Sequence, residues 1–397
     1  MTEFWSGLKI FNSALISEKT ELTKKLDDLL IENQKTRIEN HNYISAMLKM
    51  KEDSMKRQDE IFEIMSQLKI RESSIEDDFE LIECEPSPSS LTQSYQVRNV
   101  RVSAPHKLMI SYKAHEFEGI TLGYNTTGTV LLTAGNEKLL KTWDYLCGVE
   151  RQSFSGASHA ILSISVPESN DLVLAGSSSG EGYIWNSLNM KLKHKLNGHA
   201  SKVNGTGFIK YGREAVTGSE DRTIKFWDVT RGYCTKSVQV HSIIYSLSVY
   251  KEDSSIITGH KDGDLMIFYP KAAKSTKLGS EASAISGTCL SPCGNYLACL
   301  TRNHKVIVRD MRMMEVLIKL SHKSFLCPGA KTGISFSLDS RFLSSGSFNG
   351  NIYSWRLDGN CDSILHAGEK PVLAVEWNPD ESQLTSLDST GQLSVWT

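Results

Sequence analysis

The chain has 397 residues, of which 40% are hydrophobic and 23% are charged, as in ordinary soluble proteins. Its 46 acidic and 44 basic residues leave a net charge of −2, which argues against a sequence-independent nucleic-acid binder, because such a protein needs a basic excess. No apolar run reaches the roughly 18 residues of a transmembrane helix, and the start lacks the pattern of a secretory signal. The eight cysteines form no C-x-x-C pair, so we expect reduced cytosolic thiols and no zinc site.

The composition changes near residue 106. Before it the chain holds one glycine, Gly7, and is rich in helix-forming Glu, Lys, Leu, Ile and Met. After it come the other 27 glycines and most of the tryptophans, the composition of short strands joined by turns. The sequence therefore predicts a helical first part and an all-β second part.

A heptad pattern covers much of residues 1–72. Ten of its sixteen seam positions between Leu15 and Leu68 are apolar, while Asn33, Thr36 and Asn40 interrupt the seam. Polar seam residues cost stability and tend to fix the register and oligomeric state of a coiled coil. The pattern predicts an α-helical coiled coil, most simply a parallel homodimer, with a single amphipathic helix packed on its own domain as the alternative.

Residues 73–106 have the composition of a linker, with three prolines and a serine-rich run. Within them lies an acidic segment, 76–85, which holds six carboxylates and no base. Its residues with predicted roles in partner binding are Asp78, Phe79, Glu80, Leu81, Ile82, Glu83 and Glu85.

Seven copies of one pattern follow, each a small-residue strand, a turn and an apolar strand that ends at a landmark residue. The landmarks are Trp143, Trp185, Trp227, Phe268, Arg309, Trp355 and Trp396. A period of about 40 to 45 residues is typical of the WD40 repeat, in which four strands form one propeller blade. The sequence thus predicts an all-β seven-bladed WD40 propeller over residues 107–397.

A histidine precedes several landmarks by 26 to 28 residues, and the third repeat is the most complete. There we expect His199, Ser219, Asp221 and Trp227 to form a buried hydrogen-bonded network within one blade. Because such histidines fall in different blades, a metal site or a catalytic base is not expected.

Two further features concern the ring itself. The chain ends just after the third strand of repeat seven, so the run from Lys107 to Tyr112 is expected to supply the fourth strand and close the ring. The spacing before Trp355 is enlarged, which predicts a long loop over residues 321–333, with Phe325 and Leu326 exposed for docking.

Catalytic motifs are not found: the sequence contains no P-loop, G-x-S-x-G, H-E-x-x-H or EF-hand pattern. We therefore expect a non-enzymatic scaffold without a cofactor or a metal.

The order of a dimerising helix, a short acidic linker and seven WD40 repeats resembles the autophagy-related protein 16-like family. The runs DDFELIE, GSEDRTIKFWD and GHKDG, the loop HKSFLCPGAKTGISFS and the stretch IENQ carry this resemblance. It implies a cytoplasmic autophagy adaptor, recruited to autophagosome precursor membranes by peripheral, indirect association, that helps direct lipidation of the ubiquitin-like autophagy modifier.

The resemblance also implies partners. A helix face with Trp5, Leu8, Ile10 and Phe11 would bind the conjugate of autophagy-related proteins 12 and 5. The acidic segment would bind a WIPI-type phosphoinositide-reading propeller through its carboxylates, or the modifier itself by strand addition at Phe79 and Ile82. A solvated linker is the third reading of this segment. The alternative function is a WD40 scaffold of another pathway, either G-protein-β-like or a ubiquitin-ligase substrate receptor.

Overall fold

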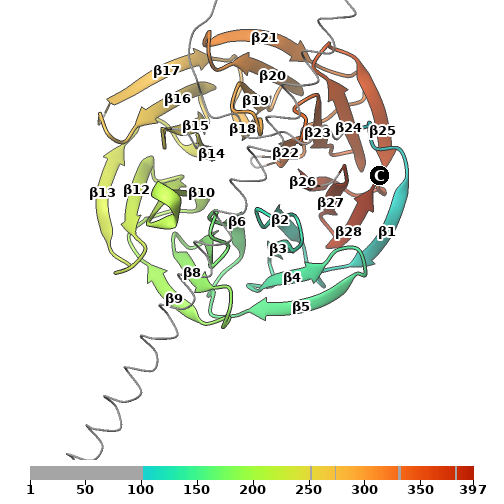
Figure 1. Ribbon diagram of the computed structural model, residues 1–397. Helices are drawn as coiled ribbons and strands as arrows, with labels where there is room; N and C mark the ends of the chain where they lie inside the picture. The colour runs from blue at the N-terminus through green and yellow to red at the C-terminus, as the bar shows by residue number, and fades with distance from the viewer. Residues whose placement is uncertain (1–101, 251–252, 273, 330–331, 381) are drawn as a thin grey trace, which may run out of the picture. The chain divides into compact units, whose positions relative to one another are not determined.

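The computed structural model describes residues 102–250, 253–272, 274–329, 332–380 and 382–397. These residues belong to one compact unit, Ser94–Thr397. They form seven four-stranded antiparallel sheets arranged as the blades of a propeller (Figure 1). The predicted seven-bladed propeller is confirmed. The predicted coiled coil, residues 1–72, lies outside the described residues.

Blades one to three consist of consecutive strands, with the first strand of each at the centre of the ring. Blade one contains β2 (Gly119–Tyr124), β3 (Leu131–Gly135), β4 (Leu140–Asp144) and β5 (Val149–Phe154). Blade two contains β6 (Ile161–Ser165), β7 (Leu172–Ser177), β8 (Gly182–Asn186) and β9 (Leu192–Leu196). Blade three contains β10 (Val203–Ile209), β11 (Glu214–Ser219), β12 (Thr223–Asp228) and β13 (Cys234–Gln239), with the short 3₁₀ helix η2 (Lys210–Gly212) between β10 and β11.

Blades four to six repeat this order. Blade four contains β14 (Ile244–Val249), β15 (Ile256–His260), β16 (Asp264–Tyr269) and β17 (Lys274–Ser280). Blade five contains β18 (Ile285–Leu290), β19 (Tyr296–Thr301), β20 (Lys305–Asp310) and β21 (Glu315–Leu320). Blade six contains β22 (Ile334–Phe336), β23 (Phe342–Gly346), β24 (Asn351–Arg356) and β25 (Cys361–His366).

Blade seven joins the two ends of the described chain. It contains β26 (Val372–Trp377), β27 (Leu384–Asp388), β28 (Gln392–Trp396) and, as its outer strand, β1 (Leu108–Lys113). The register places Tyr112 opposite Leu393, and Ser111 Oγ lies 2.8 Å from Ser394 Oγ. The segment expected to close the ring therefore forms β1 and pairs antiparallel with β28.

The predicted linker, residues 73–106, is too long at its carboxyl end. Val102 is buried and packs with Val372 and Trp396 of blade seven, and Ala104 lies against the same cluster. The backbone amides of His106 and Lys107 both donate to the carbonyl of Thr397, at 2.9 Å. Because these residues bury apolar surface and satisfy backbone groups, 102–106 is part of the propeller and not of a linker.

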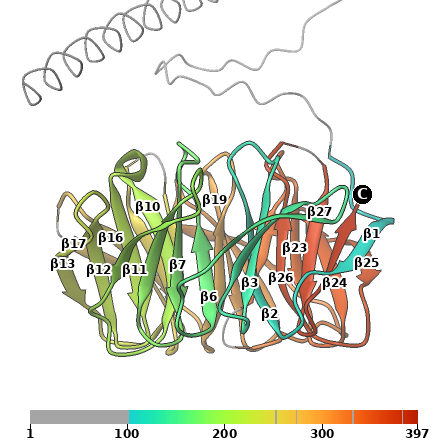
Figure 2. The same ribbon diagram turned by 90° about the horizontal axis from the view of Figure 1, so that it is seen from below.

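The hydrophobic core lies between the blades. Seven clusters of buried side chains occur in the described part, and each combines residues of two adjacent blades. Strands such as β3, β7 and β11 are therefore covered on both faces, and nearly every residue in them is buried. The view along the ring plane in Figure 2 shows these strands standing side by side around the ring.

The turn between the second and third strand repeats one backbone conformation in all seven blades. Five residues before each landmark, φ is positive, at 62° for Lys138, 65° for Arg222, 64° for His304 and 77° for Gly350. A Cβ added at Gly350 would lie 1.9 Å from the carbonyl oxygen of Gly368. This turn therefore requires a left-handed residue, and in blade six it requires glycine.

No helix in the described ranges is long and apolar enough to cross a membrane.

Candidate interaction sites

Blade three contains a chain of hydrogen bonds in its interior. Trp227 Nε1 donates to Thr217 Oγ1 at 2.8 Å, and Thr217 Oγ1 donates to His199 Nε2 at 2.7 Å. His199 Nδ1 then donates to Asp221 Oδ2 at 2.8 Å. Burial lowers the pKa of His199, so its neutral ring can accept from Thr217 and donate to Asp221 at neutral pH.

The prediction for this network is right in three residues and wrong in one. His199, Asp221 and Trp227 are brought together, but the bridging hydroxyl belongs to Thr217. Ser219 Oγ instead donates to the carbonyl of Ser201 at 3.0 Å and accepts the amide of Asp221 at 3.1 Å. Both hydroxyls lie on β11 two residues apart, and only Thr217 is within reach of the two rings.

Blade one has a matching network of four side chains. Trp143 Nε1 donates to Thr133 Oγ1 and Thr133 Oγ1 donates to His115 Nε2, both at 2.8 Å, while His115 Nδ1 lies 3.0 Å from Glu137. Burial would raise the pKa of Glu137, but hydrogen bonds from Lys141, His115 and a backbone amide outweigh it and bring the pKa to about 2. The threonine ten residues before the tryptophan is the signal common to both blades.

Blade five replaces this network by an ion pair. Arg309, which stands at the landmark position, is 8% exposed, and its Nη2 lies 2.8 Å from Glu281 Oε1. Its Nη1 donates to the carbonyl of Leu278 at 3.2 Å, and a Cβ at Gly279 would collide with the guanidinium. The long side chain thus crosses to the outer strand of blade four and links the two blades.

Two of the histidines that precede a landmark by 26 to 28 residues, His159 and His241, do not form such a network. His159 is exposed, and Trp185 Nε1 of the same blade donates to the carbonyl of Ser155 at 2.8 Å. In blade four the buried ring is His260, whose Nε2 lies 2.9 Å from Thr258 Oγ1, while His241 is about half exposed and stacks on His260 at 5.3 Å. A histidine at this spacing therefore joins a network only where the landmark is a tryptophan that donates to a threonine.

One group among the described residues has the side chains for a metal. His241 Nε2 lies 2.8 Å from Asp262 Oδ2 and 3.3 Å from Asp264 Oδ2. However, Lys277 Nζ lies 2.6 Å from Asp264 Oδ1, so this carboxylate already has a cation beside it. We treat the group as an exposed ion-pair cluster.

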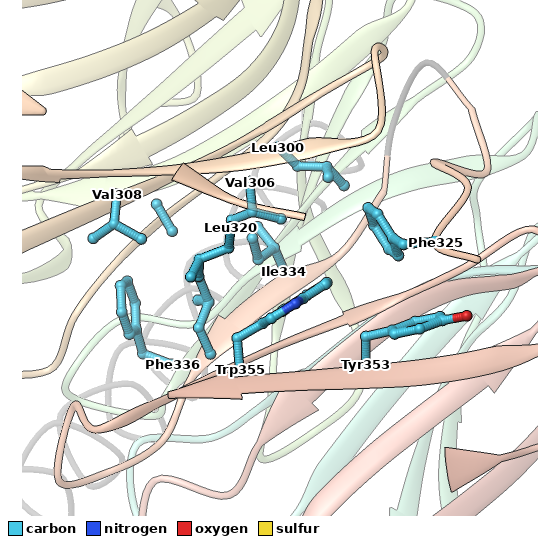
Figure 3. Packing of buried hydrophobic residues seen from close by; sticks show 11 residues of the cluster. Leu300, Val306, Val308, Leu320, Phe325, Ile334, Phe336, Tyr353 and Trp355 are labelled. Atoms are coloured by element: carbon cyan, nitrogen blue, oxygen red, sulfur yellow. The ribbon is translucent and has the colours of Figure 1, made fainter. Parts of the chain in front are cut away.

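Residues 321–329 of the enlarged loop follow blade five, and Phe325 in this stretch packs into the cluster shared by blades five and six. Phe325 is 1% exposed and contacts the rings of Tyr353 and Trp355 edge-on, with centroids 5.3 and 5.1 Å away (Figure 3). The expectation that Phe325 is exposed is therefore wrong. Leu326 is 40% exposed, and its carbonyl accepts the amide of Phe348, which is 56% exposed.

The remaining predicted site residues lie outside the described residues. These are the acidic segment with Asp78, Phe79, Glu80, Leu81, Ile82, Glu83 and Glu85, and the helix face with Trp5, Leu8, Ile10 and Phe11. Their roles stay predictions.

Comparisons with known proteins agree with this architecture. The family model "WD domain, G-beta repeat" matches residues 190–228 and 320–356. Autophagy-related protein 16 of Arabidopsis thaliana is 26% identical over 392 residues, which cover 96% of this chain and 76% of that protein.

Two further relatives match over a smaller share of their length. Protein tipD of Dictyostelium discoideum is 28% identical over 74% of this chain, and Protein Atg16l2 of Mus musculus is 28% identical over 77% of it. The chain spans about half the length of each of these two, 49% in both cases. The described residues thus form a WD-repeat propeller, and the resemblance of the chain to the autophagy-related protein 16-like family is confirmed.

Proposed function

We propose that this chain is a non-enzymatic adaptor of autophagy, which helps direct lipidation of the ubiquitin-like autophagy modifier to autophagosomal membranes. The observation that carries the proposal is the extent of the similarity to the plant protein, 96% of the chain. Residues 102–397 make up only about three quarters of the sequence, so this similarity extends well into the residues before the propeller. A match between WD repeats alone would stop at the propeller.

The interior of the propeller supports a scaffold role. His115 and His199 have both ring nitrogens in hydrogen bonds, and their partners lie within the same blade. Burial lowers the pKa of both rings, so each acts as a neutral link in the blade interior. These groups therefore stabilise the blades, which is the role expected of them in a scaffold.

The residues before the propeller would bind the other components of the autophagy machinery. Residues 1–72 would pair two chains as a coiled coil. Sedimentation of the full chain tests this directly, because it measures whether the particle has the mass of one chain or of two. The face with Trp5, Leu8, Ile10 and Phe11 would hold the conjugate of autophagy-related proteins 12 and 5. The chain would then work in the cytoplasm and be recruited to precursor membranes.

The acidic segment is assigned to a WIPI-type propeller. Glu80, Glu83 and Glu85 would face basic side chains of that partner, and Phe79, Leu81 and Ile82 would supply buried apolar area. Strand addition of Phe79 to Ile82 onto the modifier is the second candidate, and the two partners can be separated by binding assays with each purified protein.

The experiment is charge reversal of the acidic segment in cells. The variant Glu80→Lys, Glu83→Lys, Glu85→Lys is expected to lose recruitment to phosphoinositide-marked membranes. The control reverses three exposed propeller residues, Glu116, Glu315 and Glu369, and keeps the same net charge. Normal puncta in the first variant, or an equal loss in both, would reject the assignment.

A WD40 scaffold of another pathway, G-protein-β-like or a ubiquitin-ligase receptor, makes the opposite prediction. Such a protein would retain its partners through the propeller, and the same triple reversal would leave its localisation unchanged.

A further inference from the structure

Basic residues predominate along the outer edge of blades two, three and four. The outer strands β9, β13 and β17, with the turns that lead into them, hold eight Lys and Arg and no Asp or Glu. The eight are Lys191, Lys193, Lys195, Arg231, Lys236, Lys271, Lys274 and Lys277. The corresponding part of blade six holds two Asp and no Lys or Arg. The charge of this rim is therefore local, since the whole chain carries a net charge of −2.

Contacts between the blades make this basic rim one continuous surface. His194 Nε2 of β9 donates to the carbonyl of Thr230 in the turn before β13, at 3.1 Å. Lys236 of β13 lies over the rings of Phe226 and Phe268, 5.8 and 5.0 Å from their centroids, and so joins blades three and four. Figure 1 shows β9, β13 and β17 following one another along the circumference.

Five of the eight basic groups have no acidic partner among the described residues. Lys195 pairs with Glu181 at 2.7 Å and Lys277 with Asp264 at 2.6 Å, while Arg231 lies near Asp228. Lys236 lies over the two phenylalanine rings, and the other four lysines that form no ion pair with a described residue are exposed: Lys191, Lys193, Lys271 and Lys274. The rim therefore presents uncompensated positive charge to the solvent.

Large apolar side chains stand among these bases. Leu188 is 82% exposed and Met190 is 39% exposed in the turn before β9, and Leu192 begins that strand at 40%. Tyr211 of η2 is 87% exposed and Tyr233 is 48% exposed. Successive strands of a blade are antiparallel, so the turn before its second strand and the turn before its fourth strand lie at the same edge of the blade. The exposed apolar side chains lie in or next to such turns and therefore share one edge of the ring.

We propose that this rim binds the surface of an anionic membrane directly. Basic side chains near an anionic leaflet are attracted to its headgroups, and exposed Leu, Met and Tyr side chains enter the interfacial layer. The proposal adds a direct lipid contact by the propeller to the indirect association expected from the sequence.

The apolar side chains favour a membrane over a soluble polyanion. An acidic peptide or a nucleic acid would pair with the lysines. Its negative charge would gain nothing from Leu188, an apolar side chain that is 82% exposed in its turn. A bilayer uses both features at once, because its anionic surface covers an apolar layer.

The test is flotation of the full chain with phosphatidylcholine vesicles that contain or lack phosphatidylserine. Binding is expected only with phosphatidylserine and should weaken steeply as salt is raised. The variant Lys191→Glu, Lys193→Glu is expected to lower the apparent affinity by roughly thirtyfold or more. The matched control, Lys113→Glu, Lys319→Glu, changes two exposed lysines of β1 and β21 by the same charge and is expected to bind normally.

A second variant tests the apolar part. Leu188→Ser is expected to weaken vesicle binding several-fold without changing its salt dependence. Binding that is unaffected by the reversal at Lys191 and Lys193, or lowered equally by the control, would overturn the proposal. So would capture of heparin by the rim with no binding to either kind of vesicle. Vesicle binding needs no other protein, so this proposal can fail while the proposed autophagy function stands.

Discussion

Arg309, which is buried, and Glu281, which is half-buried, form an ion pair with 2.8 Å between Nη2 and Oε1, at two positions that are 28 residues apart. The same separation joins His115 to Trp143 and His199 to Trp227. Blade five therefore keeps the two anchor points of the network and changes the chemistry between them. A buried pair of this kind is worth little against apolar replacements, but a single partner left alone is costly.

The ion pair predicts a non-additive response to mutation. Glu281→Ala leaves the guanidinium of Arg309 buried without its counter-charge and is expected to cost about 3 kcal/mol of unfolding free energy. The double variant Glu281→Ala, Arg309→Leu is expected to recover most of that loss. Urea unfolding of the two single variants and the double variant measures the coupling, and additive losses would contradict a direct ion pair.

The network of blade three predicts different roles for two hydroxyls. Thr217→Val removes the bridge and leaves Trp227 Nε1 and His199 Nε2 unpaired, which is expected to cost about 2 to 3 kcal/mol. Ser219→Ala removes bonds to backbone groups only and is expected to cost about 1 kcal/mol. Urea unfolding checks the order, and a larger loss at Ser219 would restore the original assignment.

The carboxyl group of Glu376 on β26 predicts that the stability of the propeller depends on pH. Burial raises the pKa of Glu376 to about 8, above its unfolded value of 4.5. The folded state then binds more protons than the unfolded state between these values, so this group reduces stability as the pH rises from about 5 to about 8. Glu376→Gln is therefore expected to be more stable than the parent at pH 8, and by a smaller margin at pH 5. Equal margins in unfolding experiments at the two pH values would show that Glu376 is not protonated in the fold.

The turn in blade six predicts a strong demand for glycine. Gly350→Ala introduces a Cβ at positive φ and against the carbonyl of Gly368, and it is expected to cost more than about 1 to 2 kcal/mol. Gly123→Ala is the control, because nothing lies within 4 Å of a Cβ there. Thermal unfolding should separate the two variants, and equal melting temperatures would contradict the described turn.

Much of the propeller could be predicted from the sequence, because every blade fills a similar space and therefore repeats its landmark at a similar interval. The residues inside each blade were harder to assign. Thr217 and Ser219 differ by two positions on one strand, so they share a face and periodicity cannot separate them. Phe325 lies in a loop that has no periodic pattern, and its burial depends on a gap between two blades that only the folded ring creates.

The partner of Arg309 was missed for a related reason. The sequence shows that an aromatic landmark is absent there, but Glu281 lies before β18, on the far side of two strands. The signal for Glu281 is its separation of 28 residues from the landmark, which equals the separation of His115 and His199 from theirs. The site residues assigned by resemblance lie before residue 102, outside the described residues, so the propeller does not test their roles.

We propose that this chain gathers components of the autophagy machinery. The most direct measurement is a pull-down with the full chain, probed for the conjugate of autophagy-related proteins 12 and 5 and for WIPI-type proteins, beside a variant with Trp5→Ala and Phe11→Ala and the triple reversal at Glu80, Glu83 and Glu85. We predict capture of both by the parent, loss of the conjugate in the first variant and loss of the WIPI-type protein in the second. Capture of neither component by the parent chain would contradict the account.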